Sequence, residues 1–389
     1  MSASRVVRTR LVPAQQYPDL QADWCALERA ADGTPFSSWC WVSTWLRLLP
    51  PAFRPLVFST EDAHGIVALG LIVQVAESGA RRLFGSHSLH LQETGKADLD
   101  EITIEYAGLL VRGGFEDEAY AALIRTLASE LPVWRALHVS GSLRAARIAA
   151  ALPPGFRAYA NVEDFSYFVD LAGLRSAGKD YEHSLSKSTR SGLRRTERAY
   201  ASKGELRLEL ADTSERALEW LDALGILHTR YWQAKGRPGS FGSAFFRAFH
   251  RELVASGTAT GLTQLMRISA GTEVVGYLYH LVWNGWAYFY SSGLNYGLLE
   301  REDRPGYLAQ MLAIRHYADA GMHAYDFMAG SSEYKRMMST HMRPMHWIRI
   351  SPDTWRLALE RAATAMIRRS RLPAELAPTR SSDPTPLRS

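Results

Sequence analysis

The feature that most constrains the fold is a repeated alternation of short β-rich runs with amphipathic helices. The elements expected in the first half are helices at 17–34, 37–50 and 115–131 and strands at 54–60, 64–77, 101–111 and 134–141. Those expected in the second half are strands at 165–173, 261–271, 273–285, 286–295, 323–330 and 346–350 and helices at 186–204, 214–236 and 304–321. Two halves with a similar order of elements predict an α/β (α+β) chain built from a duplicated domain.

The length and composition agree with two folded domains and a tail. A chain of 389 residues is too long for one ordinary core, and a hydrophobic content of 47% is typical of globular proteins. We predict domains at 1–165 and 166–350, followed at 351–389 by a helix (354–371) and a Pro/Ser-rich disordered end.

Several functional classes are disfavoured by the sequence. The longest apolar run, residues 66–76, is much shorter than the ~20 residues of a membrane span. The first twenty residues lack the apolar segment of a secretory signal, so we expect a cytoplasmic protein without a membrane span. Neither Cys/His metal spacing nor a nucleophile, P-loop or zinc-protease motif is present, so we expect no metal site.

The stretch 186–203 concentrates positive charge, with six Lys or Arg against one Glu, although the whole chain has a net charge of only +5. Helical spacing places Lys187, Arg190, Arg194 and Arg198 on one face. Apolar packing is expected on the opposite face, which contains Leu193, Thr196 and Tyr200. Gly192 is expected to weaken the first turns. The basic face is either a solvated surface or a phosphate-binding surface.

A second motif is a hairpin followed by a well-patterned helix. Asn284-Gly285 is a dipeptide favoured in tight hairpin turns. The next helix begins with Pro305 and Gly306, and Gly321 suits its C-terminal cap. A helix start of this kind is either an ordinary N-terminus or a site where backbone N–H groups bind a phosphate.

The stretch 325–339, which follows that helix, begins with a strand that is expected to end near Phe327. A Gly-Ser-Ser turn then exposes Tyr334, Lys335 and Arg336. The two cations are either solvated loop charges or phosphate ligands.

Taken together, residues 286–295, 304–321 and 323–339 resemble the second domain of FemAB-like members of the GNAT acyltransferase superfamily. The most similar group is the CelD-type, or cellulose-biosynthesis-associated, acetyltransferases. The shared pattern is Asp326-Phe327, a Gly turn at Gly330, and Tyr334-Lys335. The basic segment, the Trp-rich helix (37–50) and the strand at 101–111 extend the resemblance over about residues 17–350.

The resemblance implies two tandem GNAT-like domains, each a mixed, mostly antiparallel sheet flanked by helices. It implies acyl-CoA, such as acetyl-CoA, as a co-substrate rather than a permanently bound cofactor. The donor pyrophosphate would lie at the helix start formed by Arg304, Gly306 and Tyr307. The usual Arg/Gln-x-x-Gly-x-Gly/Ala signature is present only in part. Lys335, Arg194 and Arg198 are the further candidates for donor binding.

Acyl transfer to an amine needs a polarised carbonyl, a base and an acid that protonates the leaving thiolate. Backbone N–H groups of the strand around residues 288–293 are candidates for polarising the carbonyl. His280 and Asp326 are candidates for the base, and Tyr290 is a candidate for the acid. Core packing explains a histidine among apolar residues equally well, and Asp326 could instead be structural.

Three functions are therefore open. The first is an acyl-CoA-dependent N- or O-acyltransferase that acts on a small-molecule or saccharide-linked amine or hydroxyl. The second is a Fem-like aminoacyltransferase that uses aminoacyl-tRNA, which is ranked lower because no heptad arm is seen. The third is a non-catalytic accessory protein of polysaccharide biosynthesis. DNA is not an expected partner.

Overall fold

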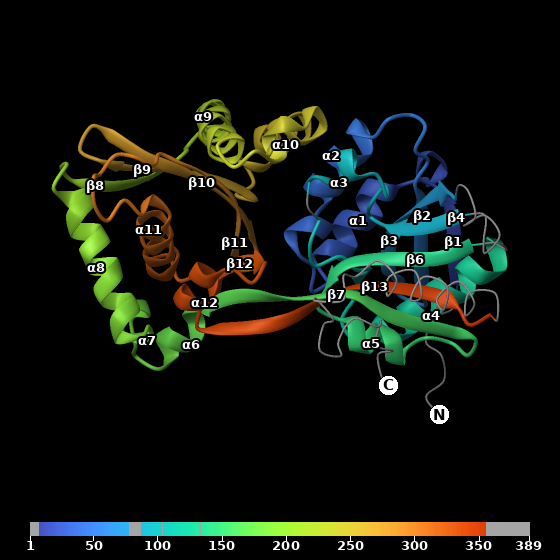
Figure 1. The fold of residues 1–389 in the computed structure, drawn as a ribbon. Coiled ribbons are helices and arrows are strands. Elements are labelled where there is room, and N and C mark those ends of the chain that lie inside the picture. The colour runs from blue at the N-terminus through green and yellow to red at the C-terminus, as the bar shows by residue number, and fades with distance from the viewer. Residues whose placement is uncertain (1–7, 78–86, 103, 132–133, 355–389) are drawn as a thin grey trace, which may run out of the picture. The chain divides into compact units, whose positions relative to one another are not determined.

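The computed structural model describes residues 8–77, 87–102, 104–131 and 134–354 (Figure 1). The helix and tail expected beyond residue 354 lie outside the described residues.

The chain forms two compact units, which are described separately. The first consists of the described parts of Met1–Trp39, Leu49–Glu163 and Met345–Ser389, and the second of Cys40–Leu48 and Asp164–Pro344. Helix α2 (Trp39–Leu48) therefore belongs almost wholly to the second unit, although it is near the beginning of the sequence. The order of elements along the sequence does not predict this grouping.

The first unit is a mostly antiparallel sheet with helices. Its strands are β1 (Arg8–Pro13), β2 (Leu56–Asp62), β3 (Gly65–Ala76), β4 (His87–Leu91), β5 (Leu110–Val111), β6 (Trp134–Ser142) and parts of β7 (Phe156–Asp170) and β13 (His341–Pro352). Its helices are η1 (Ala14–Gln16), α1 (Leu20–Glu28), η2 (Pro35–Ser37), α3 (Ala97–Asp100), α4 (Glu116–Glu130) and α5 (Ala145–Ala150). The strand order is β1-β2-β3-β4-β6-β13-β7, and β4 and β6 are parallel.

The strand expected at 101–111 is wrong for most of its length, because only Leu110–Val111 forms a strand. Tyr106 has a φ of 60°, which breaks an extended run. Its N–H donates to the carbonyl of Gly141 on β6. The buried side chains of Ile102 and Ile104 account for the apolar pattern that suggested a strand. Apolar side chains are thus buried here by an irregular segment rather than by a strand.

The second unit continues from β7 with the strand order β7-β12-β11-β10-β9-β8. Its other strands are β8 (Leu206–Leu210), β9 (Thr263–Ala270), β10 (Glu273–Trp283), β11 (Trp286–Leu294) and β12 (Ala324–Ala329). Its other helices are α6 (Leu171–Ser176), α7 (Tyr181–Ser184), α8 (Lys187–Ala201), α9 (Ser214–Gln233), η4 (Ser240–Gly242), α10 (Ala244–Gly257), α11 (Pro305–Asp319) and α12 (Glu333–Met338). Helices α9 and α10 cover one face of the sheet, α11 covers the other, and α8 packs on α11 (Figure 1).

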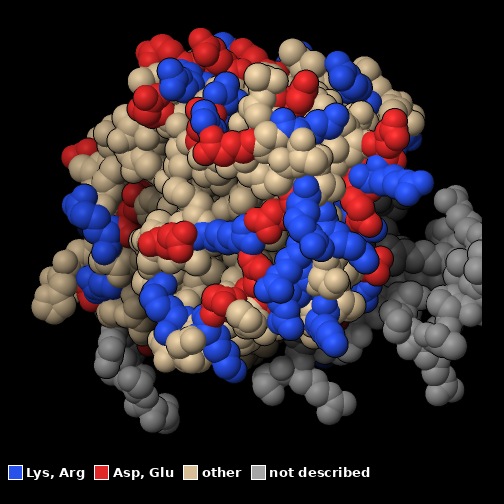
Figure 2. All heavy atoms as spheres, turned by 90° about the vertical axis from the view of Figure 1, so that its left-hand side faces the viewer, with Lys and Arg blue, Asp and Glu red and all other residues tan. Residues whose placement is uncertain are grey.

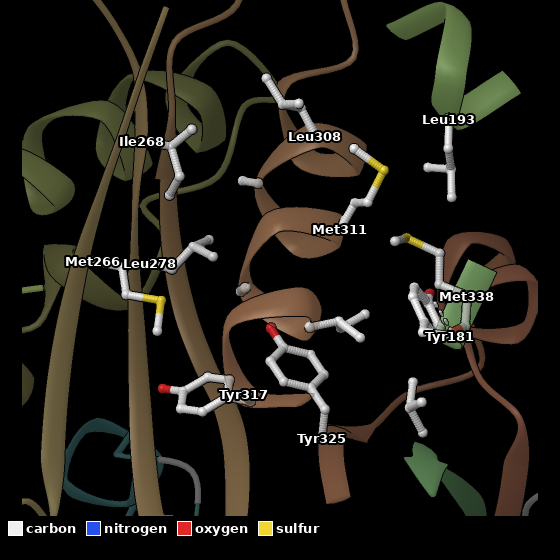
Figure 3. Close-up of a cluster of buried hydrophobic side chains, with 14 of the residues drawn as sticks. Tyr181, Leu193, Met266, Ile268, Leu278, Leu308, Met311, Tyr317, Tyr325 and Met338 are labelled. Atoms are coloured by element: carbon white, nitrogen blue, oxygen red, sulfur yellow. Dashed lines mark hydrogen bonds between the residues drawn. The ribbon is translucent and has the colours of Figure 1, made fainter. Parts of the chain in front are cut away.

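The core of this unit surrounds α11. Figure 3 shows Leu278 on the sheet side of this helix, and Leu193 of α8 and Met338 of α12 on the other side. Met311 of α11 lies among them, and all four side chains are buried. Burying an apolar side chain of this size stabilises a fold by about 1.5–3 kcal/mol. Helix α11 is therefore held from both sides.

Local sequence signals explain the main turns. Asn284 and Gly285 both have a positive φ (45° and 77°), as the predicted tight turn between β10 and β11 requires. Helix α8 begins directly after Ser186, whose side chain accepts from the Thr189 N–H at 3.1 Å. Gly192 does not interrupt this helix, whose first turns are helical from Lys187 rather than loop. The predicted fold class is confirmed: helices flank a mixed, mostly antiparallel sheet.

Candidate functional site

The parallel strands β11 and β12 of the second unit separate along their length. Their register contains three residue pairs, from Trp286↔Ala324 to Tyr288↔Asp326. Beyond these pairs, β11 continues to Leu294 and β12 to its own end without a further pair between them. The second half of β11 is therefore not paired with β12, and we call this place, where the two strands part, the opening between them; α11 connects the strands.

A β-bulge lies in β11 where this opening begins. Tyr279 of β10 pairs with Ser291, whereas its neighbour His280 pairs with Phe289, so Tyr290 is the extra residue. A bulge twists the strand and turns backbone groups out of the ladder. Backbone N–H groups turned in this way can bind a polarised carbonyl oxygen.

The start of α11 lies beside the end of β11. A side chain at Gly306 would place its Cβ 3.2 Å from Leu294 Cδ1, so the two elements are in close contact. No side chain caps the helix, whose N-cap residue is Arg304. The three residues predicted from the sequence to bind the acyl donor at this helix, Arg304, Gly306 and Tyr307, therefore lie together at the start of α11. Their assignment to a phosphate stays a prediction.

The loop before α11 is tied to the basic helix α8. Glu302 lies 3.7 Å from both Arg195 Nε of α8 and Arg304 Nε. Tyr200 of α8 donates its hydroxyl to Asp303 Oδ1 at 2.6 Å. The C-terminal half of α8 is therefore anchored to the helix start where the phosphate was predicted.

Helix α8 separates its charges between two faces. Arg315 of α11 binds both Glu182 of α7 and Glu197 of α8, so the side chain of Glu197 faces the domain. The exposed cations of the helix and its end are Lys187, Arg194, Arg195, Arg198 and Lys203. Figure 2 shows Lys and Arg side chains gathered on this side of the molecule. Arg194 and Arg198, the two residues of α8 predicted to bind the acyl donor, belong to this outward face.

Asp326 is fully buried and hydrogen-bonded within the domain. Its Oδ1 accepts from the Ser166 hydroxyl at 3.1 Å and from the Met328 N–H at 2.7 Å. Its Oδ2 accepts from Arg343 Nη2 at 2.6 Å. Met328 has a φ of 62°, an uncommon backbone conformation for a non-glycine residue. These contacts make Asp326 a residue that fixes the turn at the end of β12.

His280 is also fully buried, on the side of the sheet that faces α11. Its Nε2 lies 2.9 Å from the Tyr325 hydroxyl, which donates to Gln310 Oε1 at 2.5 Å. Because that hydroxyl donates its proton to Gln310, Nε2–H is the donor to Tyr325. Burial lowers the pKa of His280 to about 3, so the ring is neutral near pH 7. This is the geometry of a core histidine.

Tyr290 lies toward α10, on the other side of the sheet. Its hydroxyl is 3.0 Å from His250 Nε2, and His250 Nδ1 is 3.3 Å from the Tyr279 hydroxyl. Burial lowers the pKa of His250 to about 3, which makes it a weak base. The three sequence-predicted catalytic residues, His280, Asp326 and Tyr290, thus have different hydrogen-bond partners: Tyr325 for His280, Ser166 for Asp326 and His250 for Tyr290. Their catalytic roles stay predictions.

Lys335 lies on the short helix α12, which the sequence patterns did not predict. Its Nζ donates to the carbonyl oxygen of Met328, at 3.3 Å, and to that of Ala329. The side chain therefore binds the end of β12 from within the domain. A role of Lys335 in donor binding stays a prediction. In that role the ammonium group would contact the donor from its place at the end of β12.

The sequence predicts Tyr334, the neighbour of Lys335, only as an exposed residue of the turn, and this is wrong, since the residue is half-buried; the structure adds it as a candidate. Its ring contacts Phe327 of β12, with centroids 6.1 Å apart. Burial, with smaller effects from Tyr296, Tyr231 and Tyr307, raises the pKa of Tyr334 well above its usual value. Tyrosines from α9, the loop after β11, α11 and α12 therefore meet near the opening. No local pattern could bring them together, because they are up to about a hundred positions apart in the sequence.

Comparison with known families gives one match. Residues 187–336 match the family model described as an acetyltransferase (GNAT) domain. This part of the second unit is therefore similar to a GNAT acetyltransferase domain. The match runs from the start of α8 to α12 and includes every site residue predicted from the sequence.

Solved structures support the same fold over a longer part of the chain. FemX is similar with a TM-score of 0.59 at 10% identity, covering 92% of this chain and 99% of that one. The C-terminal domain of a protein from Agrobacterium fabrum, described as a lysylphosphatidylglycerol synthetase, gives 0.53 at 12% identity, with 90% and 95% covered. L-PGS from Bacillus licheniformis gives 0.50 at 12%, with 90% and 96% covered. No curated protein matches the sequence significantly.

The second unit has a pocket of about 580 Å³ between α9, η4 and α10. It is lined by Leu221, Asp222, Gly225, Ile226, Thr229, Arg230, Gln233, Phe241, Arg247 and Arg251. None of the sequence-predicted residues lines it. Among the residues that the structure describes, no group of three or more His, Cys, Asp or Glu could hold a metal ion. In the same residues, no helix has the length and apolar character of a membrane span.

Proposed function

We propose that the protein is an acyltransferase that moves an acyl group from an acyl-CoA thioester to an amine or hydroxyl of a small-molecule or saccharide-linked acceptor. The observation that carries this proposal is the separation of β11 from β12 in a GNAT domain, with the start of α11 beside the opening. A thioester can lie along the free part of β11 with its phosphates toward α11. A cytoplasmic location remains part of the proposal.

In the proposed reaction, the acceptor nitrogen or oxygen attacks the thioester carbonyl carbon. The new C–N or C–O bond forms, the C–S bond breaks, and the acceptor proton passes to solvent or a base. Backbone N–H groups at the Tyr290 bulge would stabilise the oxyanion. Tyr334, on α12 beside the end of β12, would protonate the leaving thiolate, since a tyrosine hydroxyl carries its proton at neutral pH. Asp326 would act only by holding the end of β12.

A second candidate function, aminoacyl transfer from tRNA, is favoured by the exposed cations of α8. Lys187 and Arg198 are eleven residues apart, which is about 16 Å along a helix. A row of that length is longer than the phosphates of a single nucleotide require, and it suits an RNA backbone. Such binding would weaken steeply as the salt concentration rises.

Thermal unfolding with candidate donors separates these functions. Acetyl-CoA, a long-chain acyl-CoA and an aminoacyl-tRNA would be compared, and the true donor should stabilise the protein by about 2.7 kcal/mol at a hundred times its Kd. Thiol release would then be measured with a panel of amines and saccharides. Stabilisation by tRNA alone would support the second function. Binding of CoA without turnover on any acceptor would support an accessory protein of polysaccharide biosynthesis. No stabilisation by any CoA thioester would refute the leading proposal.

A further inference from the structure

Two tyrosines form an exposed stack beside the start of α11. The rings of Tyr231, at the end of α9, and Tyr296, in the loop after β11, lie 5.3 Å apart and are inclined by 19°. Tyr296 is 49% exposed, which is unusual for so large an aromatic residue. With Tyr231 behind it, the tyrosine still presents much of its surface to solvent, so another flat ring could stack on it.

The loop that carries Tyr296 is held on both sides of this residue. Asn295 donates its N–H to the Val275 carbonyl at 2.9 Å. The Gly297 N–H donates to Asp303 Oδ2 at 2.5 Å, and Asp303 also accepts from Tyr200 of α8. A ring fixed in this way loses little conformational freedom when a ligand stacks on it.

Cations lie on the Tyr231 side of this stack, and the carboxylate of Asp303 lies on the Tyr296 side. Lys235 Nζ lies 4.2 Å from the centre of the Tyr231 ring and is hydrogen-bonded to its hydroxyl. Arg237 lies 5.9 Å from the centre of the neighbouring Trp232 ring. Arg304 follows Asp303 directly in the chain. Aromatic rings interleaved with cations are typical of surfaces that bind a base and its phosphates together.

We propose that Tyr296, backed by Tyr231, is the stacking platform for the adenine ring of an adenosine nucleotide. The inference rests on the proposed function, since the nucleotide is taken to be the non-reacting part of the acyl donor that the protein binds. Both donor classes carry this group: CoA ends in a phosphorylated adenosine, and tRNA ends in the adenosine of its CCA sequence. The acyl group would lie in the opening between β11 and β12, and the adenine would lie outside it on the loop.

The platform is tested by binding to the full-length protein, measured by calorimetry. The probes are adenosine 3′,5′-bisphosphate for the CoA source and a CCA trinucleotide for the tRNA source. The variants are Tyr296→Ala, which removes the ring, and Tyr296→Phe, which keeps it. At least one probe should bind. Tyr296→Ala should weaken its binding about tenfold, and Tyr296→Phe should leave it within about twofold of the wild type.

A kinetic comparison separates the platform from the proposed function. If acetyl-CoA is the donor, Tyr296→Ala should raise its KM about tenfold and leave the rate with S-acetylpantetheine, which lacks the adenosine, unchanged. An unchanged KM with intact turnover would overturn the platform while the acyltransferase stands. An equal loss of probe affinity in Tyr296→Ala and Tyr296→Phe, or no binding of either probe to the wild type, would also overturn the platform. Probe binding that depends on the ring would support it even if acetyl-CoA is not a donor.

Discussion

Each unit of the protein has a parallel strand pair, and the two pairs differ in how they end. In the first unit, β4 stays paired with β6 up to His90↔His138, one residue before β4 ends. These two imidazoles stack 4.7 Å apart. The segment at Tyr106 then pairs with the rest of β6, through Gly141. In the second unit, β11 and β12 part after three pairs. The same arrangement of strands is thus closed in one unit and open in the other.

Chemistry is expected at the open pair rather than at the closed one. The closed pair has filled the space between its strands with side chains and backbone hydrogen bonds. The open pair leaves part of β11 bordering the opening and gathers tyrosines near it. The proposed activity therefore belongs to the second unit, and four predictions test the comparison.

The largest effect is expected from the carboxylate at the end of the open pair. Asp326→Ala leaves Arg343 and the Met328 N–H without their buried partner, which should cost about 3–5 kcal/mol of unfolding free energy. At the closed pair, burial raises the pKa of Glu93 to about 7, so Glu93→Gln should cost less than about 1 kcal/mol. Urea unfolding measures both.

Asp212→Ala serves as the control, since Asp212 is exposed and only pairs with Arg216 at 3.6 Å. It should change stability by less than about 0.5 kcal/mol. Equal costs for the Asp326 and Glu93 variants would show that the two strand ends do not differ as described.

The next effect is on turnover. Tyr334→Phe should lower kcat about a hundredfold with little change in donor affinity, because the ring stays and the proton donor is lost. Tyr120→Phe in the first unit removes a hydroxyl that accepts from the Leu109 N–H at 3.0 Å, and it should leave kcat unchanged. Steady-state rates and donor titrations are the measurements. A normal kcat in Tyr334→Phe would remove this residue from the mechanism.

Acid should weaken the two units unequally. Burial lowers the pKa of His280 and His250 to about 3 and that of His228 to about 4. Their unfolded forms take up protons below about pH 6.5, so this stability is present above that pH and is lost as the pH falls toward the folded values. Each histidine contributes a slope of up to about 1.4 kcal/mol per pH unit.

In the first unit two buried groups oppose each other. Burial lowers the pKa of His90 to about 4, so acid destabilises this unit through His90. The raised pKa of Glu93 works in the other direction, because its contribution is lost as the pH rises through about 7 and regained below it. Hydrogen exchange between pH 7 and 5 should therefore show a steeper loss of protection in β10 and α11 than in β3 and β4. Parallel losses would contradict the histidine assignment.

The smallest effect is expected at the basic face of α8. Arg198→Glu changes an exposed side chain, and Arg194→Glu removes a loose ion pair with Glu182 at 3.8 Å, so the free energy of unfolding should change by less than about 1 kcal/mol in each. If the donor is tRNA, each loss of a contacting cation should reduce the slope of log affinity against log salt by about one. If the donor is CoA, this slope should change little. Salt titrations of donor binding make the distinction.

Periodicity predicted most of the second unit. The α8, α9 and α11 helices and the four strands from β9 to β12 all follow from patterns that neighbouring residues carry. The strand predicted at 101–111 is wrong because a pattern of buried apolar residues does not distinguish a strand from an irregular segment such as that at Tyr106. The candidate site was only partly predictable. The motif around Gly306 located the helix start, but the contact of Lys335 with β12 and the meeting of Tyr334 with Tyr231 depend on tertiary packing.

Arg315 has a consequence for how such a protein could change over evolutionary time. By binding Glu182 of α7 and Glu197 on the inner side of α8, it ties both helices to α11 through a shared ion-pair network. The outer cations Lys187, Arg198 and Lys203 are exposed and lie outside this ion-pair network, so they can be exchanged singly without loss of the fold. A lineage could thus acquire a new polyanionic partner through surface substitutions alone, while the buried ion-pair network that seats α8 stays the same.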